Sequence, residues 1–177
     1  MTKEQLCRKV LDDNKKTTTK IVVSNDIKGN YYSYVTDTVY LNNTESSDSK
    51  DVIVLCHECF HATQSKLLHI FNAFLSNIEL LMFIAILGMK FFQYENKVMS
   101  IVYIAIASLA IIIRCLLEIP AMVLSFDMAK KYKPQISTEI DNEKSKIKFM
   151  LPLGVLNFTW LKIIRILLIV FLIWVLH

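Results

Sequence analysis

The chain has 177 residues, of which 54% are hydrophobic and 20% are charged, with a formal net charge of +4. This hydrophobic fraction exceeds the roughly 45–50% that is usual for soluble domains, which excludes an ordinary soluble globular protein. Basic and aromatic residues are not interleaved as in nucleic-acid-binding chains, so no nucleic-acid partner is expected.

The first part of the chain, residues 1–66, is polar and charged, unlike the remainder. It opens on "KEQLCRKVLDDNKK", in which Leu6, Val10 and Leu11 recur at helical spacing. This pattern predicts a short amphipathic helix. Together with the strands below, it predicts a small cytosolic α+β portion.

Apolar, β-branched and aromatic residues dominate the next stretch and predict three short strands. The expected strands cover residues 20–24, 31–35 and 38–41. Thr36 and Asp37 predict the turn between the last two strands.

A polar loop, "NTESSDSK" at residues 43–50, precedes a second predicted helix. Ser47, Asp48 or Ser49 is the expected N-cap, because these side chains accept hydrogen bonds from the first helical amides. We expect the helix to start at Asp51 and to continue without a break into the first apolar run.

Three apolar runs are long enough to cross a membrane, since a hydrocarbon layer of about 30 Å requires about 20 helical residues. They cover residues 71–92, 98–124 and 150–176. The sequence therefore predicts a mainly α membrane protein. We assign a transmembrane hairpin to 67–128, a cytosolic connection to 129–149 and a third transmembrane helix to 150–177.

The basic residues flanking these runs predict the orientation of the chain. On one side lie Lys66, Lys130, Lys131, Lys133, Lys144, Lys146 and Lys148. The loop on the other side offers only Lys90 and Lys97. The positive-inside rule places the lysine-rich side in the cytoplasm. We therefore expect a multi-pass protein of the cell membrane whose N-terminal portion faces the cytoplasm.

The stretch "VLCHECFHATQ" carries the pattern His-Glu-x-x-His. On a helix His57 and His61 lie on one face, one turn apart, as two ligands of one Zn²⁺ ion require. Glu58 projects beside them, where a carboxylate can act as general base for a water molecule. The motif predicts a catalytic zinc site.

Such a site needs a third protein ligand, and the returning helix of the hairpin offers two acids. If depth on one helix mirrors depth on the other, Asp127 returns near the level of His61. Glu118 lies two to three turns deeper at 1.5 Å per residue. This rule favours Asp127 as the third ligand and leaves Glu118 as the alternative.

Three ionisable groups lie deep inside the predicted spans and need partners, because an isolated charge in hydrocarbon is costly. Glu79 lies in the first span, and Lys162 and Arg165 lie in the third. We expect Glu79 to pair with one of these cations and so to tie the two helices together.

Four segments resemble one family in their order and spacing. The opening "TKEQLCRKVLDDN" is similar to a "TGxEVARKLLDxNG" helix, and "CHECFHATQ" is similar to "AAHEVGHAIQ". "EIPAMVLSFDMAKKY" is similar to "TLPVEFNASRRAL", and "NEKSKIKFMLPLGVLNFTWLKI" resembles a closing segment. In these four segments the chain resembles the bacterial membrane-bound zinc metallopeptidases of the YugP type, which are distantly M48/HtpX-like.

The resemblance implies a membrane-embedded zinc metalloendopeptidase that cleaves a peptide or membrane-protein substrate at the cytosolic face. Such zincins pair the substrate backbone with a strand, which here implies Val39, Tyr40 and Leu41. The family's Glu in "EFNAS" aligns with Ser125, and serine is a poor zinc ligand. A catalytically inactive, metallopeptidase-like membrane adaptor is therefore the alternative function. The sequence does not indicate an oligomeric state.

Overall fold

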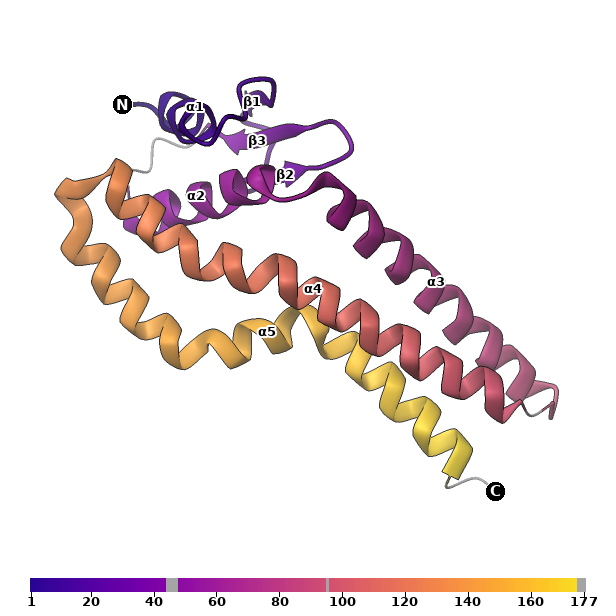
Figure 1. Cartoon of the computed structure of the whole chain (residues 1–177). Coiled ribbons are helices and arrows are strands. Elements are labelled where there is room, and N and C mark those ends of the chain that lie inside the picture. Colours follow the sequence, from indigo (N-terminus) through magenta and orange to yellow (C-terminus); the bar gives the residue numbers. More distant parts are fainter. Residues whose placement is uncertain (44–47, 95, 175–177) are drawn as a thin grey trace. The chain divides into compact units, whose positions relative to one another are not determined.

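The computed structural model describes residues 1–43, 48–94 and 96–174, and it is mostly helical with one small sheet (Figure 1). The first helix, α1, runs from Lys3 to Asp13, as predicted. It begins with a capping box, in which Thr2 and Gln5 each accept a hydrogen bond from the other's backbone amide. Its buried face consists of Leu6, Cys7, Val10 and Leu11.

The three predicted strands form one sheet in the order β1-β3-β2. They are β1 (Lys20–Ser24), β2 (Tyr31–Ser33) and β3 (Thr38–Asn42). β3 pairs with β1 in parallel and with β2 in antiparallel fashion, so β3 is the central strand. The turn before β3 contains Asp37 at a φ of 47°, a left-handed conformation that Asp tolerates better than most residues.

The helix that carries both motif histidines, α2, runs from Ser49 to Thr63 with Asp48 as its N-cap residue. Asp48 is one of the three residues that the sequence predicted as the N-cap. The expected continuous passage into the first apolar helix was wrong. Gln64 has the extended angles φ −69° and ψ 166° and ends α2, and a new helix begins at Lys66.

Three further helices are long and apolar enough to cross a membrane. They are α3 (Lys66–Phe91), α4 (Lys97–Tyr132) and α5 (Ser137–Trp174), of which α5 contains the apolar stretch Val155–Ile173. A short 3-10 helix, Pro134–Ile136, joins α4 to α5. The expected connection at 129–149 is thus almost entirely helical.

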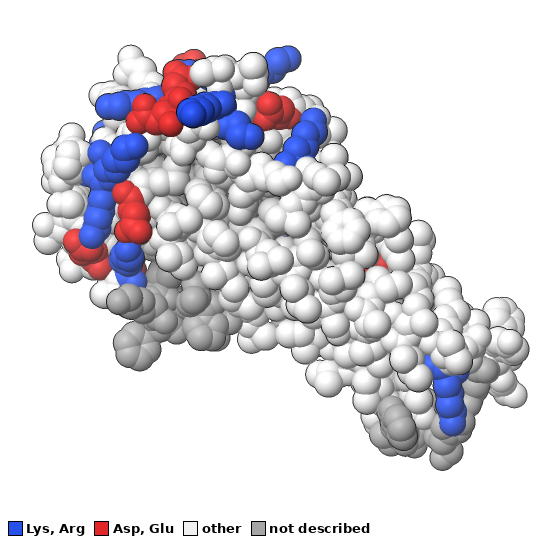
Figure 2. All heavy atoms as spheres, viewed as in Figure 1, with Lys and Arg blue, Asp and Glu red and all other residues white. Residues whose placement is uncertain are grey.

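The chain forms two compact units. The first contains residues 1–66 and 117–151, and the second contains 67–116 and 152–177. The predicted boundary at residue 128 therefore lies inside the first unit. On the face in Figure 2, charged side chains gather over the first unit, and the second unit presents mostly uncharged atoms.

Each unit has its own apolar interior. In the first, α1, β3, α2 and the end of α4 contribute fully buried side chains such as Val10, Leu41, Leu55 and Phe126. In the second, Ile86, Tyr103, Ala107 and Ile169 form a buried cluster.

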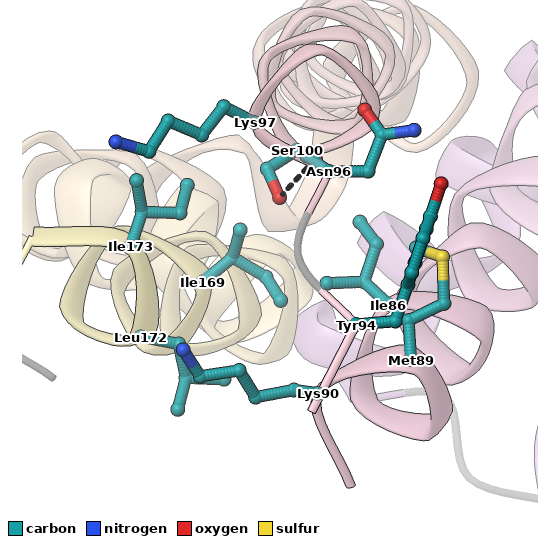
Figure 3. Close-up of a pocket in the computed structure, with 10 residues that line it drawn as sticks. All are labelled: Ile86, Met89, Lys90, Tyr94, Asn96, Lys97, Ser100, Ile169, Leu172 and Ile173. Carbon is teal, nitrogen blue, oxygen red and sulfur yellow. Dashed lines mark hydrogen bonds between the residues drawn. The ribbon is translucent and has the colours of Figure 1, made fainter. Parts of the chain in front are cut away.

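Beside the cluster of the second unit lies a pocket of about 30 Å³, enough for a water molecule but not for an organic ligand (Figure 3). Lys90 and Lys97 line this pocket together with Ile169 and Ile173.

Candidate metal centre

The two motif histidines lie side by side on α2, as their spacing predicts. Their Nε2 atoms are 3.1 Å apart, and the ring planes are almost perpendicular at 89°. His61 is buried at 8% exposure, and His57 is half-buried. A pair of imidazole nitrogens thus converges on one point inside the first unit.

The acid that joins them is Glu118 of α4. Its Oε2 atom lies 3.6 Å from His57 Nε2 and 3.5 Å from His61 Nε2. Among the described residues, these three side chains form the one group of metal-ligating atoms that all lie within 4.8 Å of each other. Glu118 belongs to the same compact unit as the histidines.

The spacing of the three ligand atoms fits a zinc ion. A tetrahedral Zn²⁺ with bonds of about 2.0–2.1 Å holds its ligand atoms about 3.3–3.4 Å apart. The observed separations of 3.1, 3.5 and 3.6 Å lie close to that value. Two imidazoles and one carboxylate are also a donor set that leaves the fourth position open, as in catalytic zinc sites.

Asp127, the acid favoured by the depth rule, is placed elsewhere. Its carboxylate is 58% exposed and accepts a hydrogen bond of 2.6 Å from Lys144 of α5. It is nine residues from Glu118, or half a turn out of phase, and therefore projects from the opposite side of α4. The rule failed because it assumed one continuous helix from His57 into the first span, and the break at Gln64 removes that premise.

Gln64, the residue that ends α2, contacts both His61 and the helix that carries Glu118. Its Nε2 donates to the backbone carbonyl of Leu117, at 2.7 Å, one residue before Glu118. Its Oε1 lies 2.8 Å from His61 Nδ1. Because an amide oxygen only accepts, neutral His61 must carry its proton on Nδ1, which puts the lone pair on Nε2, the nitrogen that a metal would bind.

The ionisation of His61 is also set by these neighbours. Burial opposes its protonation, but hydrogen bonds with Glu118 and Gln64 outweigh burial and raise the pKa of His61 above its ordinary value. A metal must therefore displace a proton from the histidine, so that affinity for the metal rises with pH.

Glu58 lies beside the histidines and is held by the sheet. Its Oε2 accepts a hydrogen bond of 2.8 Å from the backbone amide of Tyr32 in β2. Burial raises the pKa of the Glu58 carboxyl, although the two histidines and the Tyr32 amide act in the opposite direction. A carboxylate with a raised pKa next to a metal site is suited to accept and return a proton.

The strand expected to receive a substrate, Val39–Leu41, is the central strand of the sheet. Val39 and Tyr40 pair with β1 on one side and with β2 on the other, Leu41 pairs with β1, and Val39 and Leu41 are fully buried. Sheet order therefore blocks backbone pairing of a substrate with Val39 and Tyr40 on both sides, and with Leu41 on the β1 side. β2 is the edge strand that approaches α2.

Ser125, at the position of the family's Glu, does not take part in the site either. Its buried hydroxyl donates to the carbonyl of Met122 in its own helix, at 3.0 Å. Ser125 is seven residues beyond Glu118, on nearly the same face of α4 but about 10 Å further along it.

Comparisons of this chain with protein families, with curated proteins and with solved structures find no match.

Two contributors to the site were not predicted from the sequence, namely Gln64 and the backbone amide of Tyr32. The signal for Gln64 was present, because its amide directly follows the helix that carries the ligands and can turn back to His61. The role of Tyr32 had no sequence signal, since any residue supplies a backbone amide.

Proposed function

We propose that this protein is a membrane-bound, zinc-dependent metallopeptidase, in which His57, His61 and Glu118 bind the metal and Glu58 is the general base. The observation that carries the proposal is the convergence of these three ligand atoms, with Glu58 on the same helix. The proposed zincin-like character rests on this helix and on the sheet beside it, and Glu118 takes the role that the sequence favoured for Asp127.

Each residue of the site has a separate role in this proposal. The two histidines and Glu118 would hold Zn²⁺, and Gln64 orients His61 for this role. When bound, zinc lowers the pKa of water and polarises a carbonyl group. Glu58 would take a proton from the attacking water and return it to the leaving amine.

The substrate class follows from the edge strand next to the site. β2 is paired with β3 along one edge, and the backbone of Tyr32 on its other edge reaches Glu58. We propose that an extended peptide segment lies alongside β2, because β2 is an edge strand of the sheet and its Tyr32 amide contacts Glu58. Such a segment would belong to a peptide or to a membrane protein.

The lipid bilayer is the second proposed partner. Three helices have the length and composition to cross it. The lysine bias of the loops supports a site that opens to the cytoplasm.

Metal content tests the ligand assignment directly. The full-length protein, purified in detergent with zinc in the buffer, is compared with His57→Ala, Glu118→Gln and Asp127→Asn. We expect about one zinc per wild-type chain, a strong loss in the first two variants, and full content in Asp127→Asn as the matched acid control. Full zinc in Glu118→Gln with loss in Asp127→Asn would reverse the assignment.

Proteolysis tests the base. Glu58→Gln should keep its zinc and lose cleavage of a casein or peptide-library substrate, because a neutral amide cannot accept the proton. Zinc binding in the wild type together with cleavage that Glu58→Gln leaves unchanged would refute the enzymatic proposal. Zinc without any cleavage would favour the alternative, an inactive adaptor with a structural metal.

A further inference from the structure

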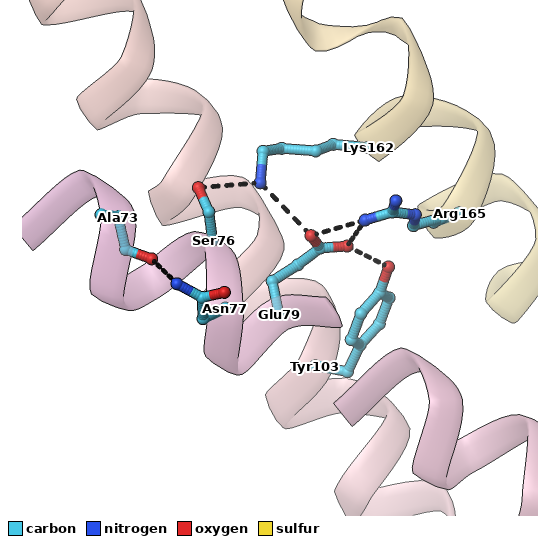
Figure 4. A network of polar contacts seen from close by, with 7 residues as sticks. All are labelled: Ala73, Ser76, Asn77, Glu79, Tyr103, Lys162 and Arg165. Atoms are coloured by element: carbon cyan, nitrogen blue, oxygen red, sulfur yellow. Dashed lines mark hydrogen bonds and ion pairs between the residues drawn. The ribbon is translucent and has the colours of Figure 1, made fainter. Parts of the chain in front are cut away.

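A cluster of charges lies in the interior of the second unit, where three candidate membrane helices meet (Figure 4). Glu79 of α3 is fully buried. Its carboxylate accepts hydrogen bonds from Tyr103 of α4 at 3.0 Å, from Lys162 of α5 at 3.2 Å and from Arg165 of α5 at 3.0 Å. The predicted pairing of Glu79 is confirmed, and it involves both cations.

The cluster is not electrically balanced. It contains two cations and one carboxylate, and within the described part of the chain Glu79 is the one acid bonded to Lys162 and Arg165. Tyr103 and Ser76, the remaining polar partners, are neutral hydroxyls. The group therefore carries one formal positive charge in excess.

This excess charge lies near the middle of the candidate membrane helices, too deep to be neutralised by lipid headgroups. Glu79 is near the middle of α3, roughly 18 Å from either end at 1.5 Å per residue. Lys162 and Arg165 are near the middle of the apolar stretch Val155–Ile173. Hydrogen bonds to Glu79 hold both cations at this depth and prevent them from extending to the membrane surface.

The two cations of the cluster are partly exposed, unlike the carboxylate that they share. The side chain of Glu79 is 0% exposed, whereas the side chains of Lys162 and Arg165 are 14% and 25% exposed. α5 is also the least covered of the three helices, with 11% of its apolar window buried against 22% and 28% for the others. Around the two cations it presents exposed apolar side chains, among them Leu161, Ile164 and Leu168.

We propose that this face of α5 binds a transmembrane helix of another protein that carries one Asp or Glu at mid-membrane depth. The carboxylate of the partner would pair with the exposed sides of Lys162 and Arg165 and bring the cluster to neutrality. Charge excludes a second copy of this chain as the occupant, because it would bring another positive cluster to the same depth. The inference does not depend on the metal site, which lies in the other unit.

The test uses the full-length protein in phosphatidylcholine vesicles at pH 7, with fluorescent leucine-rich transmembrane peptides as probes. Three peptides carry Asp, Asn or Leu at the central position, and association is measured by energy transfer to the labelled protein. We expect the Asp peptide to bind roughly tenfold more tightly than the Leu peptide, in line with the 1–2 kcal/mol typical of strong polar contacts between membrane helices. The Asn peptide should bind more tightly than the Leu peptide but less tightly than the Asp peptide.

Variants of the cluster show whether binding of the Asp peptide depends on the net charge of the cluster or only on its polar groups. Lys162→Met makes the cluster neutral and should abolish the preference for Asp. Arg165→Lys keeps the charge and should preserve the preference for Asp. Equal binding of the Asp and Leu peptides to the wild type would overturn the proposal. An Asp preference that survives in Lys162→Met, or an Asn peptide that binds as well as Asp, would also overturn it.

Discussion

Replacement of Gln64 tests a residue that supports the proposed metal site without being one of its proposed ligands. The side chain makes two hydrogen bonds, of 2.8 Å with His61 and of 2.7 Å with the Leu117 carbonyl. At about 1 kcal/mol net for each bond, Gln64→Ala should lower the free energy of unfolding by roughly 2 kcal/mol. Loss of the partner that orients a ligating histidine typically weakens metal binding about 10- to 100-fold, and we expect a zinc affinity reduced to that extent.

Competition with a chromophoric zinc chelator measures this affinity in the purified protein. Gln135→Ala, an exposed glutamine in the same unit, is the matched control and should bind zinc as the wild type does. Gln64→Glu keeps an acceptor for His61 Nδ1–H but cannot donate to Leu117, so it should retain most of the zinc affinity and lose stability. Wild-type zinc affinity in Gln64→Ala would refute the positioning role, and equal weakening in Gln64→Glu and Gln64→Ala would assign the effect to the Leu117 contact.

Three further outcomes follow from other contacts. Tyr132 donates a hydrogen bond of 2.8 Å to Asp13 and is the main cause of the lowered pKa of that carboxyl. Because the pKa of Asp13 is lower in the folded than in the unfolded protein, Asp13 stabilises the fold above its unfolded pKa, and this stability is lost as the pH falls through the folded value. Tyr132→Phe removes most of this effect. Between about pH 6 and pH 3 its free energy of unfolding, measured by denaturant titration, should therefore fall less than that of the wild type. Ser125→Ala should keep full zinc content and change the free energy of unfolding by no more than about 1 kcal/mol, because its hydroxyl makes one hydrogen bond within its own helix. Loss of zinc in this variant would show that Ser125 contributes to the site. A membrane-impermeant maleimide applied to intact cells should label Asn96→Cys and spare Lys28→Cys, and the reverse pattern would invert the proposed orientation.

Much of the local structure was determined by the sequence alone. The apolar spacing of Leu6, Val10 and Leu11 specified α1, and the spacing of His57 and His61 placed both imidazoles on one face. The three long apolar runs specified their helices by length and composition. These features depend on periodicity along one segment, which a sequence displays directly.

Contacts between segments were decided by the tertiary structure. The position of Glu118, rather than Asp127, beside the two histidines depended on the break at Gln64 and on which side of α4 turns toward α2. The central position of β3, which closes both of its edges, came from a strand order that local pattern does not encode. The pairing of Glu79 with two cations rather than one depended on Lys162 and Arg165, nearly one turn apart on α5, facing the same carboxylate. In each case the deciding quantity was the direction in which a side chain or strand edge points, and packing sets that direction.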